Sequence, residues 1–190
     1  MDQIDAHGLR FRKRFLDSPL QVIKHILRVN ISIFIMIFTR RKNRISAAFR
    51  ERLNLAVCGV NECLYCTHLH TKTALAAGVT GEQAAAILAG ETEGVPAQEA
   101  RAVAFARYWA DSGGWDDTDG YGALVETYGE AKAATIRASL HVIQAGNMCS
   151  NTAEAFRVKA APRSGPGFFL AWVLAAPVAF MVRLMGGYRR

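Results

Sequence analysis

The sequence lacks the marks of several common protein classes. No run of alternating apolar and polar residues predicts a strand, and alanine-rich helical patterns dominate instead. No secretory signal is recognisable, because the first apolar run begins near residue 29, after a long charged lead, and a basic cluster follows it. Only four cysteines occur. We therefore expect a cytoplasmic protein in which cysteine serves redox or metal chemistry and not a framework of structural disulfides.

Acidic residues are scarce at both ends of the chain. Residues 160–190 contain four arginines and no acid, and residues 1–44 contain ten Lys or Arg against three acids. Residues 45–159 reverse this balance, with nine basic residues against thirteen acids. The basic residues flank apolar runs, whereas a nucleic-acid site would interleave them with aromatic residues on a folded face. This distribution argues against a nucleic-acid partner.

Two apolar runs lie within the basic ends, at Val29–Phe38 and Phe168–Val182. An apolar run bordered by cations is typical of contact with a membrane surface, here the inner face of the membrane. The second run has about 15 apolar residues and is interrupted by Pro177. It is therefore shorter than the roughly 17–25 residues that a spanning helix needs. The alternative is that both runs are core or oligomer-interface helices.

The middle of the chain is predicted to be a series of helices joined by short turns. Ile45, Phe49, Leu53 and Val57 form an apolar stripe close to the helical period. Glycines, capping residues and a first-turn proline predict further helices that begin near residues 62, 80, 96, 121 and 130. We expect an all-α protein with three parts: an apolar, basic N-terminal arm (1–40), a helical domain (41–161), and a linker with an apolar C-terminal tail (162–190).

The stretch CLYCTHLH places two cysteines and two histidines within eight residues. On a helix, Cys63, Cys66 and His70 share one face, whereas His68 points elsewhere. If Asn61 caps this helix, Cys63 lies in its first turn, where free N–H groups and the helix dipole favour a thiolate. His70, four residues beyond Cys66, suits a base or a hydrogen-bond partner of Cys66. The pattern predicts a redox dithiol with an acid–base group beside it.

Two other kinds of site fit this stretch less well. A tetrahedral metal would have to collect Cys63 and His70, which are about 10 Å apart along an unbroken helix, and no second CxxC pair is present. Covalent haem attachment needs C-x-x-C-H, but position 67 is threonine. We therefore expect no metal or other cofactor. The remaining alternative is a pair of buried cysteines with a hydrogen-bonded core histidine.

Glu51 adds a fourth member to the motif, because it lies twelve residues before Cys63 and completes the spacing E-x11-C-x-x-C-x3-H. This spacing resembles the signature of the carboxymuconolactone decarboxylase superfamily, in its alkylhydroperoxidase D-like branch. The resemblance extends over about residues 40–160 and includes the later segment GNMCSNT. Some relatives have histidine between the two cysteines where this chain has Tyr65. The resemblance implies an all-α fold and a homo-oligomer.

The resemblance also implies site residues and a function. Cys66 would attack the peroxide, Cys63 would resolve the product, and His70 and Glu51 would relay protons. The helix-start argument instead favours Cys63 as the more acidic thiol. We expect a thiol-dependent peroxidase that uses a hydroperoxide substrate and a dithiol or lipoyl-type electron donor, with a peroxiredoxin as a further partner. The alternatives are a thiol–disulfide relay, a redox-sensing interaction protein, and a decarboxylase-like lyase, which generally lacks the CxxC pair.

Overall fold

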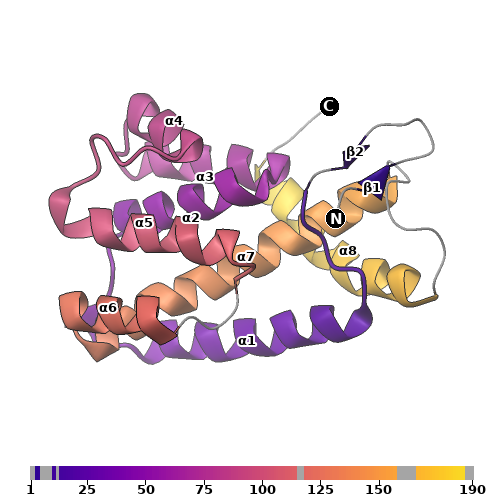
Figure 1. The fold of residues 1–190 in the computed structure, drawn as a ribbon, viewed down its shortest axis with the longest axis horizontal. Coiled ribbons are helices and arrows are strands. Elements are labelled where there is room, and N and C mark those ends of the chain that lie inside the picture. Colours follow the sequence, from indigo (N-terminus) through magenta and orange to yellow (C-terminus); the bar gives the residue numbers. More distant parts are fainter. Residues whose placement is uncertain (1–2, 5–9, 12, 115–117, 158–165, 187–190) are drawn as a thin grey trace.

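One long helix, α7, crosses the middle of the computed structural model, and the other helices pack around it (Figure 1). The structure describes residues 3–4, 10–11, 13–114, 118–157 and 166–186. Within these residues the elements are β1 (Gln3–Ile4), β2 (Arg10–Phe11), α1 (Pro19–Phe38), the 3-10 helix η1 (Arg41–Asn43), α2 (Ala47–Asn61), α3 (Leu64–Ala76), α4 (Gly81–Ala89), α5 (Ala97–Asp111), α6 (Thr118–Tyr128), α7 (Glu130–Arg157) and α8 (Pro166–Gly186).

The predicted all-α fold is confirmed, with one small addition. β1 and β2 pair in antiparallel fashion, with Gln3 opposite Phe11 and Ile4 opposite Arg10. The expectation of no strand was therefore wrong for these residues. Two residues on each strand are too few to display the alternating pattern on which strand prediction depends. Residues 158–165, which include most of the predicted linker, lie outside the described part of the chain.

Local capping explains several helix ends. Ser46 and Thr80 each accept a hydrogen bond from the backbone N–H three residues on, as their positions before α2 and α4 require. Gly90 ends α4 with a φ of +100°, in the left-handed region that glycine adopts without steric cost. These caps define where α2 begins and where α4 begins and ends, so the connections on either side of α4 are short.

The core forms two apolar clusters. The larger one lies among α2, α3, α5 and α7 and contains Leu53, Trp109 and Leu140. The smaller one joins the segment before α1, α1 itself, α7 and α8; its buried members are Leu16, Val22, Met148, Cys149, Ala171 and Ala175. The N-terminal and C-terminal helices therefore pack against α7 and against each other.

The two apolar runs belong to longer helices than the sequence suggested. α1 begins at Pro19, where Ser18 caps it, and α8 continues through Pro177 to Gly186. Both helices are long and apolar enough to cross a membrane by length and composition. The first apolar run appears shorter in the sequence because Lys24 and Arg28 interrupt the apolar residues of α1. The second appears shorter because Pro177 suggests a break, although α8 continues through it.

Candidate active site

The turn between α2 and α3 places the first cysteine. Asn61, the last residue of α2, donates its side-chain amide to Gln144 Oε1 at 2.7 Å. Asn151 Nδ2 in turn donates to the backbone oxygen of Asn61 at 2.8 Å, so α7 holds this turn from two positions. Glu62 then adopts a left-handed φ of 51°, which reverses the chain so that α3 begins directly after Cys63.

Cys63, and not Asn61, is the N-cap of α3, so the condition under which Cys63 would lie in the first turn is not met. The Cys63 Sγ accepts the backbone N–H of Cys66 at 3.3 Å, as a capping side chain does. The Cys66 thiol approaches Ser150 Oγ of α7 at 3.7 Å. Both cysteines are buried and reduced. The pair is therefore adjacent but not joined.

The surroundings of the two thiols shift their pKa values in opposite directions. Burial raises the pKa of Cys63, but hydrogen bonds from the Cys66 thiol, the Cys66 backbone N–H and Ser150 outweigh this, so the net shift is downward. The pKa of Cys66 lies well above its usual range, because its thiol hydrogen bonds to Cys63, is buried, and lies beside the Cys63 charge. Cys63 is thus the more acidic member, but because of its hydrogen bonds with Cys66 and Ser150 and not because of a place within the first turn.

Glu51 and His70 form the second half of the site. Glu51 is on α2 and His70 on α3, and the two helices bring His70 Nδ1 within 2.7 Å of Glu51 Oε2. The same carboxylate oxygen accepts the hydroxyl of Thr73 at 2.8 Å and the amide of Asn54 at 3.3 Å. Glu51 is only 5% exposed, so its carboxylate lies inside the helical domain and not on the surface.

These contacts determine the charge state of Glu51. Burial raises the pKa of its carboxyl, but the hydrogen bond from His70, the His70 charge, and the hydrogen bonds from Thr73 and Asn54 outweigh burial and lower it overall. With Nδ1–H donating to the carboxylate, the imidazole of His70 is oriented and its Nε2 remains for proton exchange. Glu51 therefore acts as a fixed anion that orients the histidine.

A cavity of about 560 Å³ connects the two halves of the site. Cys66, His70, Glu51 and Asn54 are among the residues that line it, and most of its wall is apolar. Cys63 is not among the residues that line it. The more acidic thiol is therefore covered, and the less acidic thiol faces the space that a substrate would occupy.

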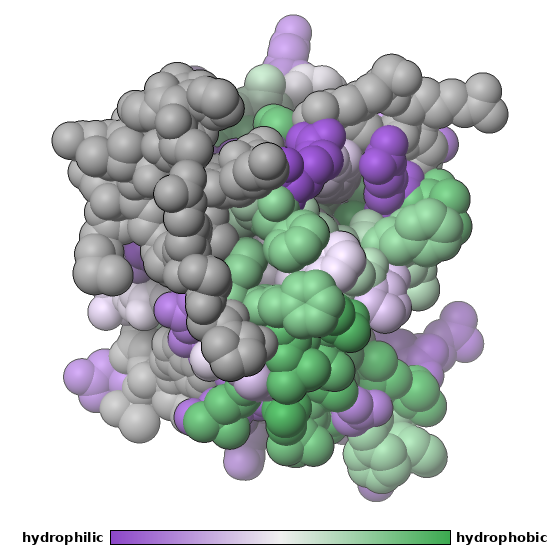
Figure 2. All heavy atoms as spheres, turned by 90° about the vertical axis from the view of Figure 1, so that its right-hand side faces the viewer, coloured by the Kyte–Doolittle hydropathy of each residue, from purple (hydrophilic) through white to green (hydrophobic). Residues whose placement is uncertain are grey.

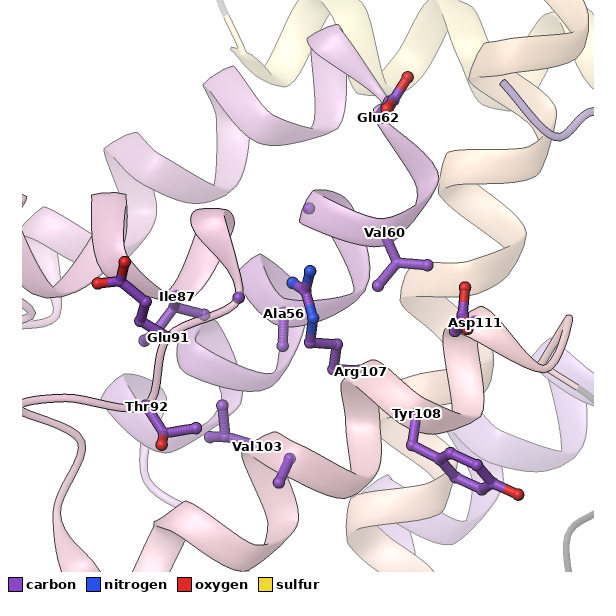
Figure 3. Close-up of a pocket in the computed structure, with 13 residues that line it drawn as sticks. Ala56, Val60, Glu62, Ile87, Glu91, Thr92, Val103, Arg107, Tyr108 and Asp111 are labelled. Carbon is purple, nitrogen blue, oxygen red and sulfur yellow. The ribbon is translucent and has the colours of Figure 1, made fainter. Parts of the chain in front are cut away.

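A second cavity of similar volume lies elsewhere, among α2, α4 and α5 (Figure 3). Arg107 points into the space between Ala56 and Val60, and Tyr108 points away from it. This cavity is lined by none of the four residues that the motif contains. We therefore place the candidate site at the first cavity.

The structure brings Cys63, Cys66, His70 and Glu51 together, as the spacing indicated. Sequence reasoning missed Asn54, Thr73 and Ser150, which contact these residues. Asn54 and Thr73 each lie three residues beyond a motif member on its helix, so the i, i+3 spacing was the available signal. Ser150 lies within GNMCSNT, where only a general likeness had been noted.

The other cysteines and polar residues of interest have supporting positions. Cys58 and Cys149 are buried, as expected for small core residues, although Cys149 also borders the cavity. Asn147 is fully buried and accepts the Cys58 thiol at 3.6 Å. His68 lies on the exposed side of α3. Tyr65 is buried, and the Arg183 guanidinium of α8 lies 6.0 Å from its ring centre.

Residues 34–108 match the model of the carboxymuconolactone decarboxylase family. Over these residues the chain is similar to that family. The match runs from the second half of α1 to the end of α5 and contains all four motif residues. No curated protein and no solved structure matches the chain. The carboxymuconolactone decarboxylase family includes both peroxidases and decarboxylases, so the reaction has to be argued from the site.

The lowered pKa of Glu51 predicts how stability depends on pH. Its folded-state pKa lies below its unfolded value, so its contribution is complete above about pH 4.5 and is lost as the pH falls through the folded pKa. Glu51→Gln should therefore destabilise the protein at pH 7 by about 1–3 kcal/mol, and the difference from wild type should shrink in acid. Urea unfolding between pH 7 and pH 3 measures both.

Glu126→Gln is the control for this measurement, because Glu126 is exposed on α6. Its unfolding curves should follow those of the wild type across the whole pH range. If Glu51→Gln loses as much unfolding free energy in acid as at pH 7, the charge of Glu51 does not contribute to stability, and the shape of its side chain does.

Proposed function

We propose that the protein is a thiol-dependent hydroperoxidase of the alkylhydroperoxidase D-like branch. The observation that carries this proposal is that Cys66, His70 and Glu51 line one mainly apolar cavity, with Cys63 in contact with Cys66. A reactive thiol, a second thiol within reach, an oriented imidazole and a place for an organic substrate are what the reaction needs.

The chemistry proceeds in two steps. The Cys66 thiolate attacks the distal oxygen of R–OOH, the O–O bond breaks, and the alkoxide takes a proton to leave as R–OH while Cys66 becomes a sulfenic acid. The Cys63 thiolate then attacks the Cys66 sulfur, the S–O bond breaks, and the hydroxyl group leaves as water with one more proton. The products are one alcohol, one water and the Cys63–Cys66 disulfide. An external dithiol returns two electrons and two protons.

The opposite pKa shifts support this division of roles. The lowered pKa of Cys63 favours its thiolate, which can take the proton of the Cys66 thiol and so transfer the negative charge to the sulfur that faces the cavity. When Cys66 has been oxidised, Cys63 can again lose its proton and attack, because its site favours the charged form. His70 supplies the proton for the departing alkoxide, and Glu51 holds its ring in position.

The reductant and the assembly belong to the same proposal. A small dithiol of the lipoyl type, with a peroxiredoxin as a second client, would restore the reduced pair, and the functional unit would be a homo-oligomer. A thiol–disulfide relay and a redox sensor use the same dithiol without peroxide turnover. A lyase of the decarboxylase type would leave the CxxC pair without a role.

The test is stopped-flow oxidation of the reduced protein by cumene hydroperoxide. Oxidation should be faster than that of free cysteine under the same conditions, should yield one cumyl alcohol for each disulfide, and should place that disulfide at Cys63–Cys66 in peptide maps. Repeated turnover with dihydrolipoamide distinguishes an enzyme from a sensor that is oxidised once. Oxidation no faster than that of free cysteine would exclude the peroxidase and leave the relay.

A further inference from the structure

Helix α1 carries most of its large apolar residues on the side away from the protein. Its buried residues are Val22, His25 and Ser32, and two of these three are polar. Its contacts with α7 are partly made by hydroxyl groups. Ser32 Oγ lies 3.3 Å from His141 Nδ1 of α7. Thr39, the C-cap of α1, places its Oγ1 3.2 Å from the hydroxyl of Thr135, which is also on α7. Its exposed large apolar residues are Leu20, Ile23, Ile26, Leu27, Ile31, Ile33, Phe34, Ile37 and Phe38.

Helix α8 has the same arrangement. Ala171, Ala175 and Ala179 recur every four residues and are buried, which lets the backbone of α8 lie close to its neighbours. Its exposed large apolar residues are Phe169, Leu170, Val173, Phe180, Met181, Leu184 and Met185. Small residues at the helix contact and large apolar residues outside are typical of helices whose outer face meets lipid.

We call the exposed apolar residues of α1 and α8 the apolar face. Elsewhere in the described part of the chain the exposed large apolar residues are only Leu64, Leu75, Tyr108 and Phe156. Figure 2 shows hydrophobic side chains gathered over the middle and lower part of the end of the molecule where α1 and α8 begin. An exposed apolar surface of this extent marks an interaction site.

The charges around the apolar face favour an anionic lipid surface over a second copy of the chain. No acidic residue occurs from residue 18 to residue 50 or from residue 166 to residue 186. The cations of this region are Lys24, Arg28, Arg40, Arg41, Lys42, Arg44, Arg50 and Arg183. Two copies meeting through this face would bring like charges together, whereas anionic headgroups would neutralise them.

The same two helices form the wall of the candidate active site. Ile26 and Ile33 of α1 and Met181 and Met185 of α8 line the cavity that contains Cys66 and are also members of the apolar face. The cavity therefore reaches the surface between α1 and α8, within the apolar face. His25 also lines it, and burial, together with the Arg28 charge, lowers its pKa to about 4, so this wall is uncharged at pH 7.

We propose that the apolar face docks on an anionic bilayer and that the cavity takes from it a hydroperoxide carried on an acyl chain. The substrate assignment rests on the proposed function, whereas the docking does not. Docking leaves α1 and α8 lying on the bilayer surface, because both helices are packed along α7 within the helical bundle. The acyl chain would enter between α1 and α8 and present its peroxide group to Cys66.

The test uses the full chain and the variant Ile31→Glu/Phe34→Glu/Phe180→Glu. These three side chains belong to the apolar face but do not line the cavity. The matched control is Leu75→Glu/Tyr108→Glu, which also replaces exposed apolar residues, on α3 and α5. Three readouts are taken: sedimentation with vesicles of phosphatidylcholine with or without phosphatidylglycerol, oxidation by phospholipid hydroperoxide held in those vesicles, and oxidation by cumene hydroperoxide in solution.

The wild type and the control should sediment with vesicles that contain phosphatidylglycerol. The triple variant should lose this binding and should react at least tenfold more slowly with the vesicle-held hydroperoxide, while its reaction with cumene hydroperoxide is unchanged. Vesicle binding with no reaction toward either peroxide would support docking and overturn the peroxidase and substrate assignments.

Two results would overturn the docking proposal. One is a wild-type protein that does not sediment with vesicles although it reacts with cumene hydroperoxide. The other is a triple variant that dissociates an oligomer in light scattering and leaves vesicle binding intact, because the apolar face would then be an interface between copies. Equal rates of wild type and triple variant toward the vesicle-held hydroperoxide would overturn entry of substrate from the bilayer.

Discussion

Cys66→Ser should abolish the oxidation of the protein by cumene hydroperoxide. Cys66 is the member of the pair that lines the cavity, and a serine hydroxyl does not attack a peroxide oxygen at neutral pH. Cys63→Ser should still undergo the first step and then stop at the sulfenic acid, because the thiol that closes the disulfide is missing. Stopped-flow fluorescence measures the first step, and trapping with dimedone followed by mass spectrometry identifies the sulfenic acid.

The control for both variants is Cys58→Ser. Cys58 is buried and its thiol contacts Asn147 Oδ1, a contact that a serine hydroxyl also makes. This variant should react as the wild type does. If Cys63→Ser is inert and Cys66→Ser still forms a sulfenic acid, the roles are reversed, and the lower pKa of Cys63 would outweigh the exposure of Cys66 to the cavity.

The helices of the central domain could be predicted because their signals are local. The stripe from Ile45 to Val57, the cap at Thr80 and the left-handed glycine at position 90 each act within one or two helical turns. The start of α3 was mispredicted by two residues. Its position depends on bonds from Gln144 and Asn151, more than eighty residues away, and no local pattern contains them.

The site could be predicted only as far as the motif spacing extends. The spacing pointed to Glu51 and His70 as members of one site, and the structure places His70 Nδ1 2.7 Å from Glu51 Oε2 across two helices. The cavity could not be predicted, because nearly half of the residues that line it come from α1 and α8, which lie outside the motif. Their apolar residues were noted at the sequence level, but their relation to Cys66 depends on how both helices pack on α7.

The opposite pKa shifts of the two cysteines also depend on tertiary structure. The sequence offered two conflicting arguments, one from the helix start for Cys63 and one from the His70 spacing for Cys66. The structure gives Cys63 the capping position and gives Cys66 the contact with Ser150 of α7 and the place on the cavity. Acidity and access are thus divided between the two thiols, which the spacing alone could not reveal.

His70→Gln should slow the oxidation of the dithiol by cumene hydroperoxide by about 10²–10⁴-fold, the usual contribution of a positioned general acid or base. Glutamine keeps a hydrogen-bond donor for Glu51 but cannot release a proton to the alkoxide leaving group near neutral pH. The pH dependence of the rate should change as well, because the imidazole that exchanges protons with the substrate is removed. Stopped-flow rates between pH 5 and pH 9 measure both effects.

The matched control is His68→Gln, two residues earlier on the exposed side of the same helix. This variant makes the same His-to-Gln substitution but leaves the contact between His70 and Glu51 intact. Its oxidation rate and pH profile should therefore follow those of the wild type. Equal rates for the two variants would remove His70 from the proton transfer. Equal unfolding free energies for wild type and both variants would show that a slower rate reflects chemistry and not a loss of fold.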